Sequence, residues 1–219
     1  MRSYPPFNPL DKLNLGRSVA DALVQRPLSA LPPEDKFEAA GIYAIYYLGE
    51  FELYLPMTRY SKTFPEQEAI PIYVGKAVPD GARKGGSLPG EAPGTAVYDR
   101  LKKHAQSIRA AENLDLNDFK CRFLSVDSIW IPLGETLLID RFSPLWNLRL
   151  DGFGNNDPGK GRHLGRRSAW DVLHPGRGWA EKLQPGKSLK TITADISTYL
   201  TVRYPLTSDR KESPYTPSP

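Results

Sequence analysis

Two short runs of aromatic and branched residues constrain the fold of this chain more than any other feature. The first reads GIYAIYY over residues 41–47, and the second reads PIYVG over residues 71–75. Aromatic and β-branched residues favour extended strands, and glycine lets neighbouring backbones approach closely. We therefore expect two strands, residues 41–48 and 71–75, each carrying a tyrosine near a glycine: Tyr43 and Tyr73.

Three further segments continue the order of elements. Residues 119–126 alternate as a third strand, and residues 96–112 carry apolar residues at helical spacing behind Thr95 as N-cap. A second helix begins near Pro132 and ends before Pro144. The order β-β-α-β-α predicts an α+β fold in which a small three-stranded antiparallel sheet is flanked by helices.

Two element signals lie nearer the termini. Residues 18–25 are expected to form a short helix, because Pro27 interrupts anything longer. Residues 198–202 read Thr-Tyr-Leu-Thr-Val, and this composition is typical of a strand.

By composition the chain divides into three parts. Residues 1–36, rich in Pro, Leu and Ser, are expected to form an N-terminal arm or subunit contact. Residues 37–150 form the core, with long loop insertions at 56–70 and 76–95. The first insertion suits a hairpin loop, and the second is too rich in Gly and Pro for regular structure. Residues 151–219 form a basic, glycine-rich C-terminal extension and tail.

Composition also limits the class of protein. The 219 residues suit one domain with arms, and no apolar run approaches the roughly 18–20 residues that a membrane span requires. One cysteine, Cys121, makes neither an internal disulfide nor a cysteine zinc cluster, and it is expected to be a small buried residue. Because the N-terminus lacks an apolar leader, we expect a cytoplasmic protein with no membrane partner.

Positive charge is concentrated in one stretch of the extension. The net charge of +4 and the pI of about 9.1 make the chain only moderately basic, which by itself does not indicate nucleic-acid binding. A local excess of basic residues is typical of a surface that binds a phosphate backbone, although it equally suits a solvated face. The basic residues of this stretch are Lys160, Arg162, Arg166, Arg167, Arg177, Lys182, Lys187 and Lys190.

Four residues downstream of the two strands carry functional groups suited to phosphate chemistry. Arg100 and His104 share one face of a helix, where an arginine can hold a phosphate oxygen and a histidine can move a proton. Glu135 lies near the start of an apolar helix and suits either a capping group or the protein ligand of a hard cation. Asn147 follows that helix as a turn residue or a hydrogen-bonding group that orients its neighbours.

In this order the residues resemble the motifs of the GIY-YIG nuclease superfamily. Residues 41–43 match the first motif, and residues 73–75 match the second with valine for isoleucine. Residues 135–147 resemble the family's Glu helix, its aromatic-x-Pro turn and its terminal asparagine. The resemblance covers about residues 40–150 and implies a nuclease whose catalytic residues are Tyr43, Tyr73, Arg100, His104, Glu135 and Asn147.

The resemblance further implies hydrolysis of a phosphodiester bond by an activated water. Glu135 would hold one divalent cation, Mg²⁺ or Mn²⁺, and Arg100 would hold the phosphate. Tyr43 is favoured over Tyr73 as the group that accepts the proton of the water. A free tyrosine has a pKa near 10, so help is expected from His104, the cation or Lys76.

Insertions between the motifs resemble those of the type II restriction endonucleases of the superfamily, most closely the branch that cuts CCGCGG. A palindromic duplex DNA implies a homodimer, and a restriction system implies a cognate DNA methyltransferase in the host. Basic residues near the motifs and in the extension are the candidates for contact with bases or phosphates. They are Lys76, Arg83, Lys84, Lys160, Arg162, Arg166, Arg167 and Arg177.

Other readings stay open. A repair or homing nuclease of the same superfamily would bring a separate DNA-binding module, and a non-catalytic DNA-binding protein would have lost Arg100 or Glu135. Residues 154–160 fit the spacing of a nucleotide-binding loop, but Gly161 stands where Ser or Thr is required. His163 and His174 are candidates for DNA contacts or plain surface residues.

Overall fold

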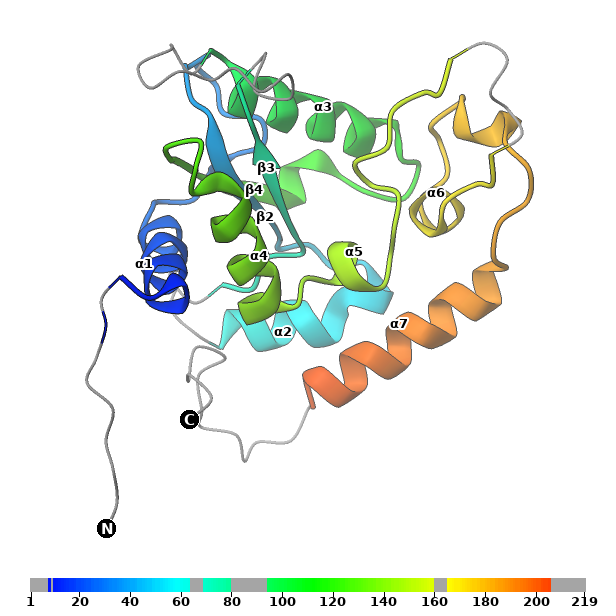
Figure 1. Cartoon of the computed structure of the whole chain (residues 1–219). Coiled ribbons are helices and arrows are strands. Elements are labelled where there is room, and N and C mark those ends of the chain that lie inside the picture. The colour runs from blue at the N-terminus through cyan, green and yellow to red at the C-terminus, as the bar shows by residue number, and fades with distance from the viewer. Residues whose placement is uncertain (1–7, 9, 64–68, 80–93, 160–164, 206–219) are drawn as a thin grey trace.

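The fold is built on a four-stranded antiparallel sheet (Figure 1). The computed structural model describes residues 8, 10–63, 69–79, 94–159 and 165–205. The strand order is β1-β4-β2-β3, and β3 therefore forms one edge of the sheet. The strands are β1 (Ser29–Ala30), β2 (Gly41–Tyr47), β3 (Tyr73–Ala77) and β4 (Phe119–Ser125).

Strand β2 is buried on both faces, which explains its unbroken run of apolar and aromatic residues. Because successive side chains point to opposite faces, β2 divides the core into two clusters. Ile42, Ala44 and Tyr46 belong to one cluster. Tyr43 and its alternate partners on β2 belong to the other. The predicted strands near residues 41–48 and 119–126 are confirmed within one residue.

Helices cover each face of the sheet (Figure 1). Helices α1 (Lys12–Val24) and α4 (Ile131–Phe142) pack on the face that carries Ile42. The core cluster on the opposite face, which contains Tyr43, includes residues of the remaining helices. These are α2 (Leu55–Lys62), α3 (Ala96–Ala110), α5 (Leu145–Leu148), α6 (Ala169–Leu173) and α7 (Leu189–Arg203), with 3-10 turns at Glu52–Tyr54, Leu116–Asp118 and Ala180–Lys182.

The expected α+β class is confirmed, with one strand more than the three expected. The added strand, β1, contributes two residues that pair with β4. The helix expected at residues 18–25 begins earlier, because the side chain of Asp11 accepts a hydrogen bond from Leu13 N and caps α1. Helix α1 packs on α4, so close that a Cβ on Gly16 would overlap Leu137.

Two local expectations are wrong. The strand expected at residues 198–202 is the end of α7, because Ile192, Ile196 and Leu200 recur at a spacing of four and bury one helical face. The helical period of these residues outweighs the strand preference of the threonines and the tyrosine around them. The hairpin loop expected at residues 56–70 begins with α2, whereas residues 64–68 lie outside the described part.

The C-terminal extension packs against the core as far as α7. Phe153, Trp170 and Ile196 belong to the same buried cluster as Tyr43. Cys121 is buried and free, as expected. Among the described residues, no helix is long and apolar enough to cross a membrane.

Candidate active site

The two tyrosines meet over the edge strand of the sheet. Tyr43 on β2 lies opposite Gly75 on β3, and Tyr73 lies two residues earlier on β3. The ring of Tyr43 extends over Gly75 so closely that a Cβ there would lie 2.4 Å from the tyrosine hydroxyl oxygen. Gly75 therefore makes room for Tyr43, and the two tyrosine rings lie with centroids 6.4 Å apart.

Helix α3 brings His104 to the same place. The hydroxyl of Tyr43 and Nε2 of His104 form a buried hydrogen bond of 2.8 Å. The imidazole also contacts the ring of Tyr73 edge-on, with a centroid distance of 5.2 Å. The sequence-predicted residues Tyr43, Tyr73 and His104 thus form one cluster, although they come from three separate elements.

Burial and charge set the protonation states of this cluster. Burial lowers the pKa of His104 to about 3, and Arg100 and Arg177 add to that effect. The imidazole is therefore neutral at pH 7, with one nitrogen as donor and the other as acceptor. Burial raises the pKa of Tyr43 well above its ordinary value, and Tyr73 and Glu135 raise it further.

Arg100 lies one helical turn before His104 and is half-buried. Its positive charge lowers the pKa of Tyr43 and of Tyr73, against the larger opposing effect of burial. Arg100 therefore stabilises negative charge at both hydroxyl groups. A guanidinium in this position can hold a phosphate oxygen beside the tyrosines.

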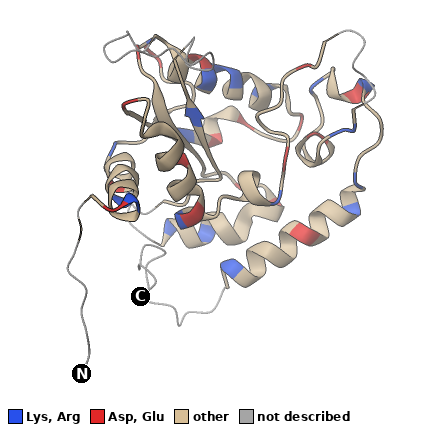
Figure 2. Ribbon diagram, in the orientation of Figure 1, with Lys and Arg blue, Asp and Glu red and all other residues tan. Residues whose placement is uncertain are grey.

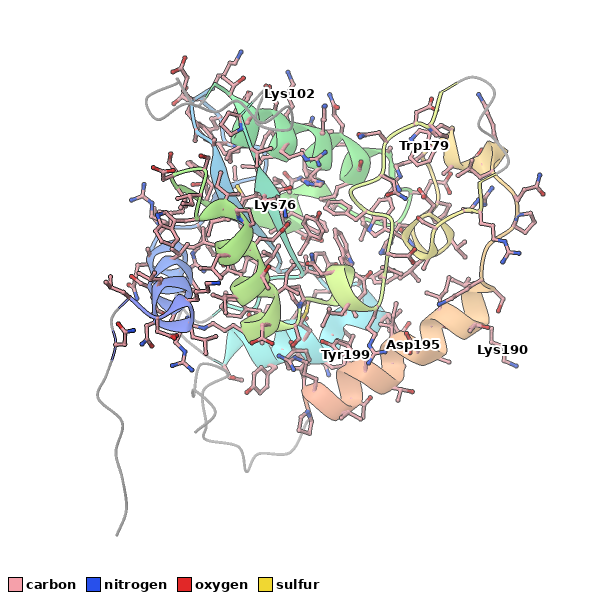
Figure 3. The ribbon with its side chains drawn as sticks, viewed as in Figure 1. Lys76, Lys102, Trp179, Lys190, Asp195 and Tyr199 are labelled. Carbon is pink, nitrogen blue, oxygen red and sulfur yellow. The ribbon has the colours of Figure 1, made fainter. Side chains whose placement is uncertain are left out.

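Glu135 approaches the same edge of the sheet from the other face. Helix α4 carries it, and its Oε2 atom lies 2.6 Å from Nζ of Lys76 on β3. Figure 3 shows Lys76 projecting from β3 beside α4. The Glu135 side chain is 19% exposed, so solvent and substrate can reach the ion pair. Residues from both faces of the sheet thus meet at the edge that β3 forms.

The donor set at Glu135 fits a cation that keeps most of its ligands outside the protein. Among the described residues no cluster of three His, Cys, Asp or Glu side chains could enclose a metal ion. Mg²⁺ commonly binds one or two carboxylates and completes its shell with water and phosphate oxygens. A single, partly exposed carboxylate with a displaceable lysine partner meets that requirement.

Asn147 contacts the backbone of β3. Its Oδ1 atom accepts a hydrogen bond from Val74 N, and its Nδ2 atom donates one to Val74 O, each at 2.8 Å. Val74 lies between Tyr73 and Gly75, so the amide pairs with the free edge of the strand at the point where the two tyrosines meet.

The predicted DNA contacts have different environments. Arg166 is exposed, and Lys76 pairs with Glu135. Arg167 donates hydrogen bonds to the carbonyl groups of Ala180 and Glu181. Arg177 is 5% exposed and fully engaged inside the protein, so the expectation that it contacts DNA is replaced by a structural role. The others, Arg83, Lys84, Lys160 and Arg162, lie outside the described residues.

His174 is also buried, which excludes the expected surface or DNA-contact role. Its Nε2 atom hydrogen-bonds to the hydroxyl of Tyr54 at 2.6 Å, and its Nδ1 atom to Oδ1 of Asn113 at 2.8 Å. His163 lies outside the described residues.

Sequence reasoning missed Phe153 as part of the site. Its ring stacks on that of His104 at a centroid distance of 4.6 Å and contacts Tyr73 at 5.0 Å. A lone phenylalanine between glycines was the only available signal, and it does not reveal a partner some 50 residues away.

Most of the chain matches a described family of proteins. Curated proteins give no significant match. A family model described as the Eco29kI GIY-YIG domain matches residues 35–200, which include Phe153, α6 and most of α7. The match covers more than half of the chain and agrees with the mixed fold and the antiparallel sheet. The chain therefore belongs to the Eco29kI GIY-YIG family of type II restriction endonucleases, and it is a nuclease of that family.

Proposed function

We propose that this protein is a type II restriction endonuclease that hydrolyses both strands of a palindromic duplex DNA, with CCGCGG as the expected site. The buried hydrogen bond between Tyr43 and His104 carries the proposal, because it supplies a proton path beside Arg100 and Glu135. A palindrome requires two copies of the site, so the active form is a homodimer. The host is expected to contain a DNA methyltransferase that protects the same sequence.

Two positive groups, Arg100 and a cation at Glu135, would offset the negative charge of the scissile phosphate. Arg100 holds a phosphate oxygen and opposes the negative charge that grows in the transition state. Glu135 would hold Mg²⁺ or Mn²⁺, and such a cation, when bound, stabilises charge on the phosphate and the leaving oxygen. Lys76 neutralises Glu135 before DNA binds, and it is then free to pair with a neighbouring phosphate.

Tyr43 would take the proton of the attacking water. The two proton transfers would be concerted. The water gives one proton to the Tyr43 oxygen, while Tyr43 gives its own proton to Nε2 of His104, so the tyrosine stays neutral. No tyrosinate needs to accumulate, which suits a tyrosine whose pKa burial raises well above the usual value. Tyr73, which is less buried, would position the water or the phosphate.

Binding of DNA would make His104 a better base. Arg100 is, after burial, the main cause that lowers the pKa of His104. A phosphate paired with Arg100 cancels part of its positive charge and so raises the proton affinity of the imidazole. The relay is therefore ready only when a phosphate is in place.

A plasmid digest with Mg²⁺, followed by sequencing of the fragment ends, tests the proposal. Discrete fragments with ends in one palindrome support it. Nicking that depends on DNA structure would indicate a repair nuclease, and binding without any cleavage would indicate a non-catalytic protein. Either of these outcomes overturns the proposal.

Glu135→Gln separates chemistry from binding. We expect cleavage to fall on the order of 100-fold or more, because the cation loses its protein ligand, while DNA binding persists. Glu112→Gln, an exposed glutamate just beyond the far end of α3, serves as the matched control and should cleave as the wild type does. Equal rates for both variants would exclude Glu135 as the metal ligand.

A further inference from the structure

The turn after α5 brings two residues of the C-terminal extension into the active site. Phe153 is 1% exposed, and its ring is nearly parallel to the imidazole of His104, with an interplanar angle of 17°. At Gly154 an added Cβ would lie 3.3 Å from the hydroxyl oxygen of Tyr73. The position of residues 152–155 therefore decides how the imidazole and the second tyrosine are held.

One side chain binds most of the carbonyl groups of this turn. The guanidinium of Arg177 donates from Nη2 to Gly152 O at 2.9 Å. Its Nη1 atom donates to Phe153 O at 3.1 Å and to Asn155 O at 3.2 Å. Because the guanidinium is planar and rigid, three carbonyl groups bound to it are fixed relative to one another.

Arg177 is itself fixed from every side. Its Nε atom donates to Oδ1 of Asp171 at 2.6 Å, and both side chains of this ion pair are at most 3% exposed. The hydroxyl of Ser168 donates to the other oxygen of Asp171 at 2.6 Å. The rings of Trp170 and Trp179 lie 4.5 Å and 4.8 Å from the guanidinium carbon. Figure 3 shows Trp179 in the extension, beside the chain that follows α5.

The backbone of the turn adds a second constraint. Gly152 has a φ of +103°, and a Cβ there would lie 2.0 Å from Oγ of Ser168. The turn therefore packs directly against the residue that orients Asp171. The ion pair, the serine and the turn form one unit, which we call the Arg177 clamp: Gly152, Phe153, Asn155, Ser168, Asp171 and Arg177.

Stability alone is a weak reason for a buried ion pair. Removing both charges from water costs free energy that their attraction often fails to regain, and apolar replacements are frequently as stable. In some proteins such groups instead specify one conformation, and here the hydrogen bonds of Arg177 lead through the turn to the ring that stacks on His104. The clamp is thus placed to control the orientation of the His104 ring.

We propose that the Arg177 clamp positions the catalytic histidine: Arg177 holds the turn at residues 152–155, and the turn seats Phe153 on the ring of His104. Arg177 and Phe153 act as positioning residues that do not touch the substrate. The role in catalysis rests on the nuclease function proposed above, whereas the link from Arg177 to His104 is a property of the folded chain.

The link can be measured without any DNA. The chain contains three histidines, so the ring protons of His104 can be assigned by NMR with His104→Gln as reference. Phe153→Leu removes the stacked ring, and we expect the His104 signals to lose their ring-current shift. Arg177→Lys keeps the charge but cannot span three carbonyl groups, and we expect the same signals to move or broaden. Arg203→Lys is the matched control, because Arg203 binds the carbonyl of Phe142 away from the site.

The effect on catalysis is measured as single-turnover cleavage of a duplex that the wild type cuts. Phe153→Leu and Arg177→Lys should each slow cleavage, by up to about 100-fold, while DNA affinity without divalent cation stays unchanged. Arg203→Lys should cleave normally. If Arg177 acts through Phe153, the double variant is no slower than the slower single variant.

The outcomes separate the two proposals. Unchanged His104 signals in Phe153→Leu and in a folded Arg177→Lys overturn the clamp. So do additive losses of cleavage rate in the double variant. Should Arg177→Lys fail to fold, Ser168→Ala takes its place, because it removes only the hydroxyl that orients Asp171 and should move the same His104 signals. If the wild type cleaves no DNA, the proposed function fails, and the NMR result still shows whether Arg177 positions His104.

Discussion

Tyr43 is the residue on which the proposed chemistry depends, and its surroundings have opposing effects on its pKa. Burial, Tyr73 and Glu135 raise its pKa, whereas Arg100 lowers it. A buried hydroxyl that is hard to ionise needs a partner for its proton, and Nε2 of His104 lies 2.8 Å away. In the proposed mechanism the pair therefore acts as one unit, because neither group would be an effective base by itself.

Replacing Tyr43 by Phe removes the hydroxyl and keeps the ring. We expect the single-turnover rate to fall by about 10²- to 10⁴-fold, the usual contribution of a general base. Tyr73→Phe, measured in parallel across pH, should reduce the rate less, because in the proposed mechanism Tyr73 only positions the reactants. Tyr199→Phe removes a hydroxyl that donates to Ser143 O on the far side of the core, and it is the control. A larger loss of cleavage rate for Tyr73→Phe than for Tyr43→Phe would show that Tyr73 is the base and that Tyr43 positions the reactants.

Two buried histidines make stability depend on pH. Burial lowers the pKa of both His104 and His174 to about 3, from an ordinary value of 6.5. Between these values the unfolded chain binds protons that the folded chain does not. The free energy of unfolding therefore falls as pH drops below 6.5, by about 1.4 kcal/mol per pH unit for each histidine.

Thermal unfolding measured from pH 7.5 to 4.5 checks this slope. His174→Gln should flatten it by about half, since one of the two groups is gone. NMR titration gives an independent reading: the signals of His104 and His174 should not shift between pH 7 and 5. Two histidines that titrate near 6.5 in the folded protein would contradict the expected burial effect.

At the scale of elements, the edge strand β3 organises the site. It carries Tyr73, Gly75 and Lys76, and it is fixed by the pairing with β2 on one side and by the amide of Asn147 on the other. The sequence motifs predicted that two strands bring the tyrosines together. They did not predict the register, in which Gly75 lies directly under Tyr43, because register depends on the whole sheet.

Gly75→Ala tests the register. The new Cβ would lie 2.4 Å from the Tyr43 hydroxyl, and two hydrogen-bonded strands cannot easily separate to relieve the contact. The hydroxyl must therefore move away from His104, and we expect cleavage to fall by about 100-fold with DNA affinity retained. Gly178→Ala, at a glycine with open space around it, is the control. Wild-type cleavage by Gly75→Ala would show that the hydrogen bond to His104 is dispensable.

For the whole molecule, the sequence predicted the part of the fold that local patterns encode. Strands β2 and β4 and helices α3 and α4 follow from apolar periodicity and from Pro132 and Pro144 at the helix ends. The expected site residues of these elements lie together at the edge of β3. The contribution of the extension was not predictable, because Phe153 and Arg177 act through contacts between segments that no local pattern links.

The exposure of the basic residues was likewise not predictable from the sequence. Figure 2 shows Lys and Arg on α3 and near both ends of α7. Within the basic stretch, however, Arg166 is exposed and Arg177 is buried with Asp171. Composition predicts that a segment is basic, but only the packing decides which of its charges can reach DNA.

The extension should be part of the folding unit. It supplies large side chains to the cluster that contains Tyr43, and their removal would expose Tyr54 and Trp146, which are at most 2% exposed. Each lost core side chain costs about 2–5 kcal/mol, and a whole domain is stable by only about 5–15 kcal/mol. A chain that ends at residue 150 is therefore expected not to fold.

Circular dichroism and NMR of the fragment 1–150 check this expectation. We predict no cooperative thermal transition and little dispersion of the amide signals. Co-expression with residues 151–219 as a separate chain should restore both, because the clamp lies wholly within that second chain and its Phe153 can still stack on His104 of the first once the apolar surfaces associate. A fragment that unfolds cooperatively and cleaves DNA by itself would show that residues 37–150 form an independent core. Phe153 and Arg177 would then be dispensable for catalysis as well.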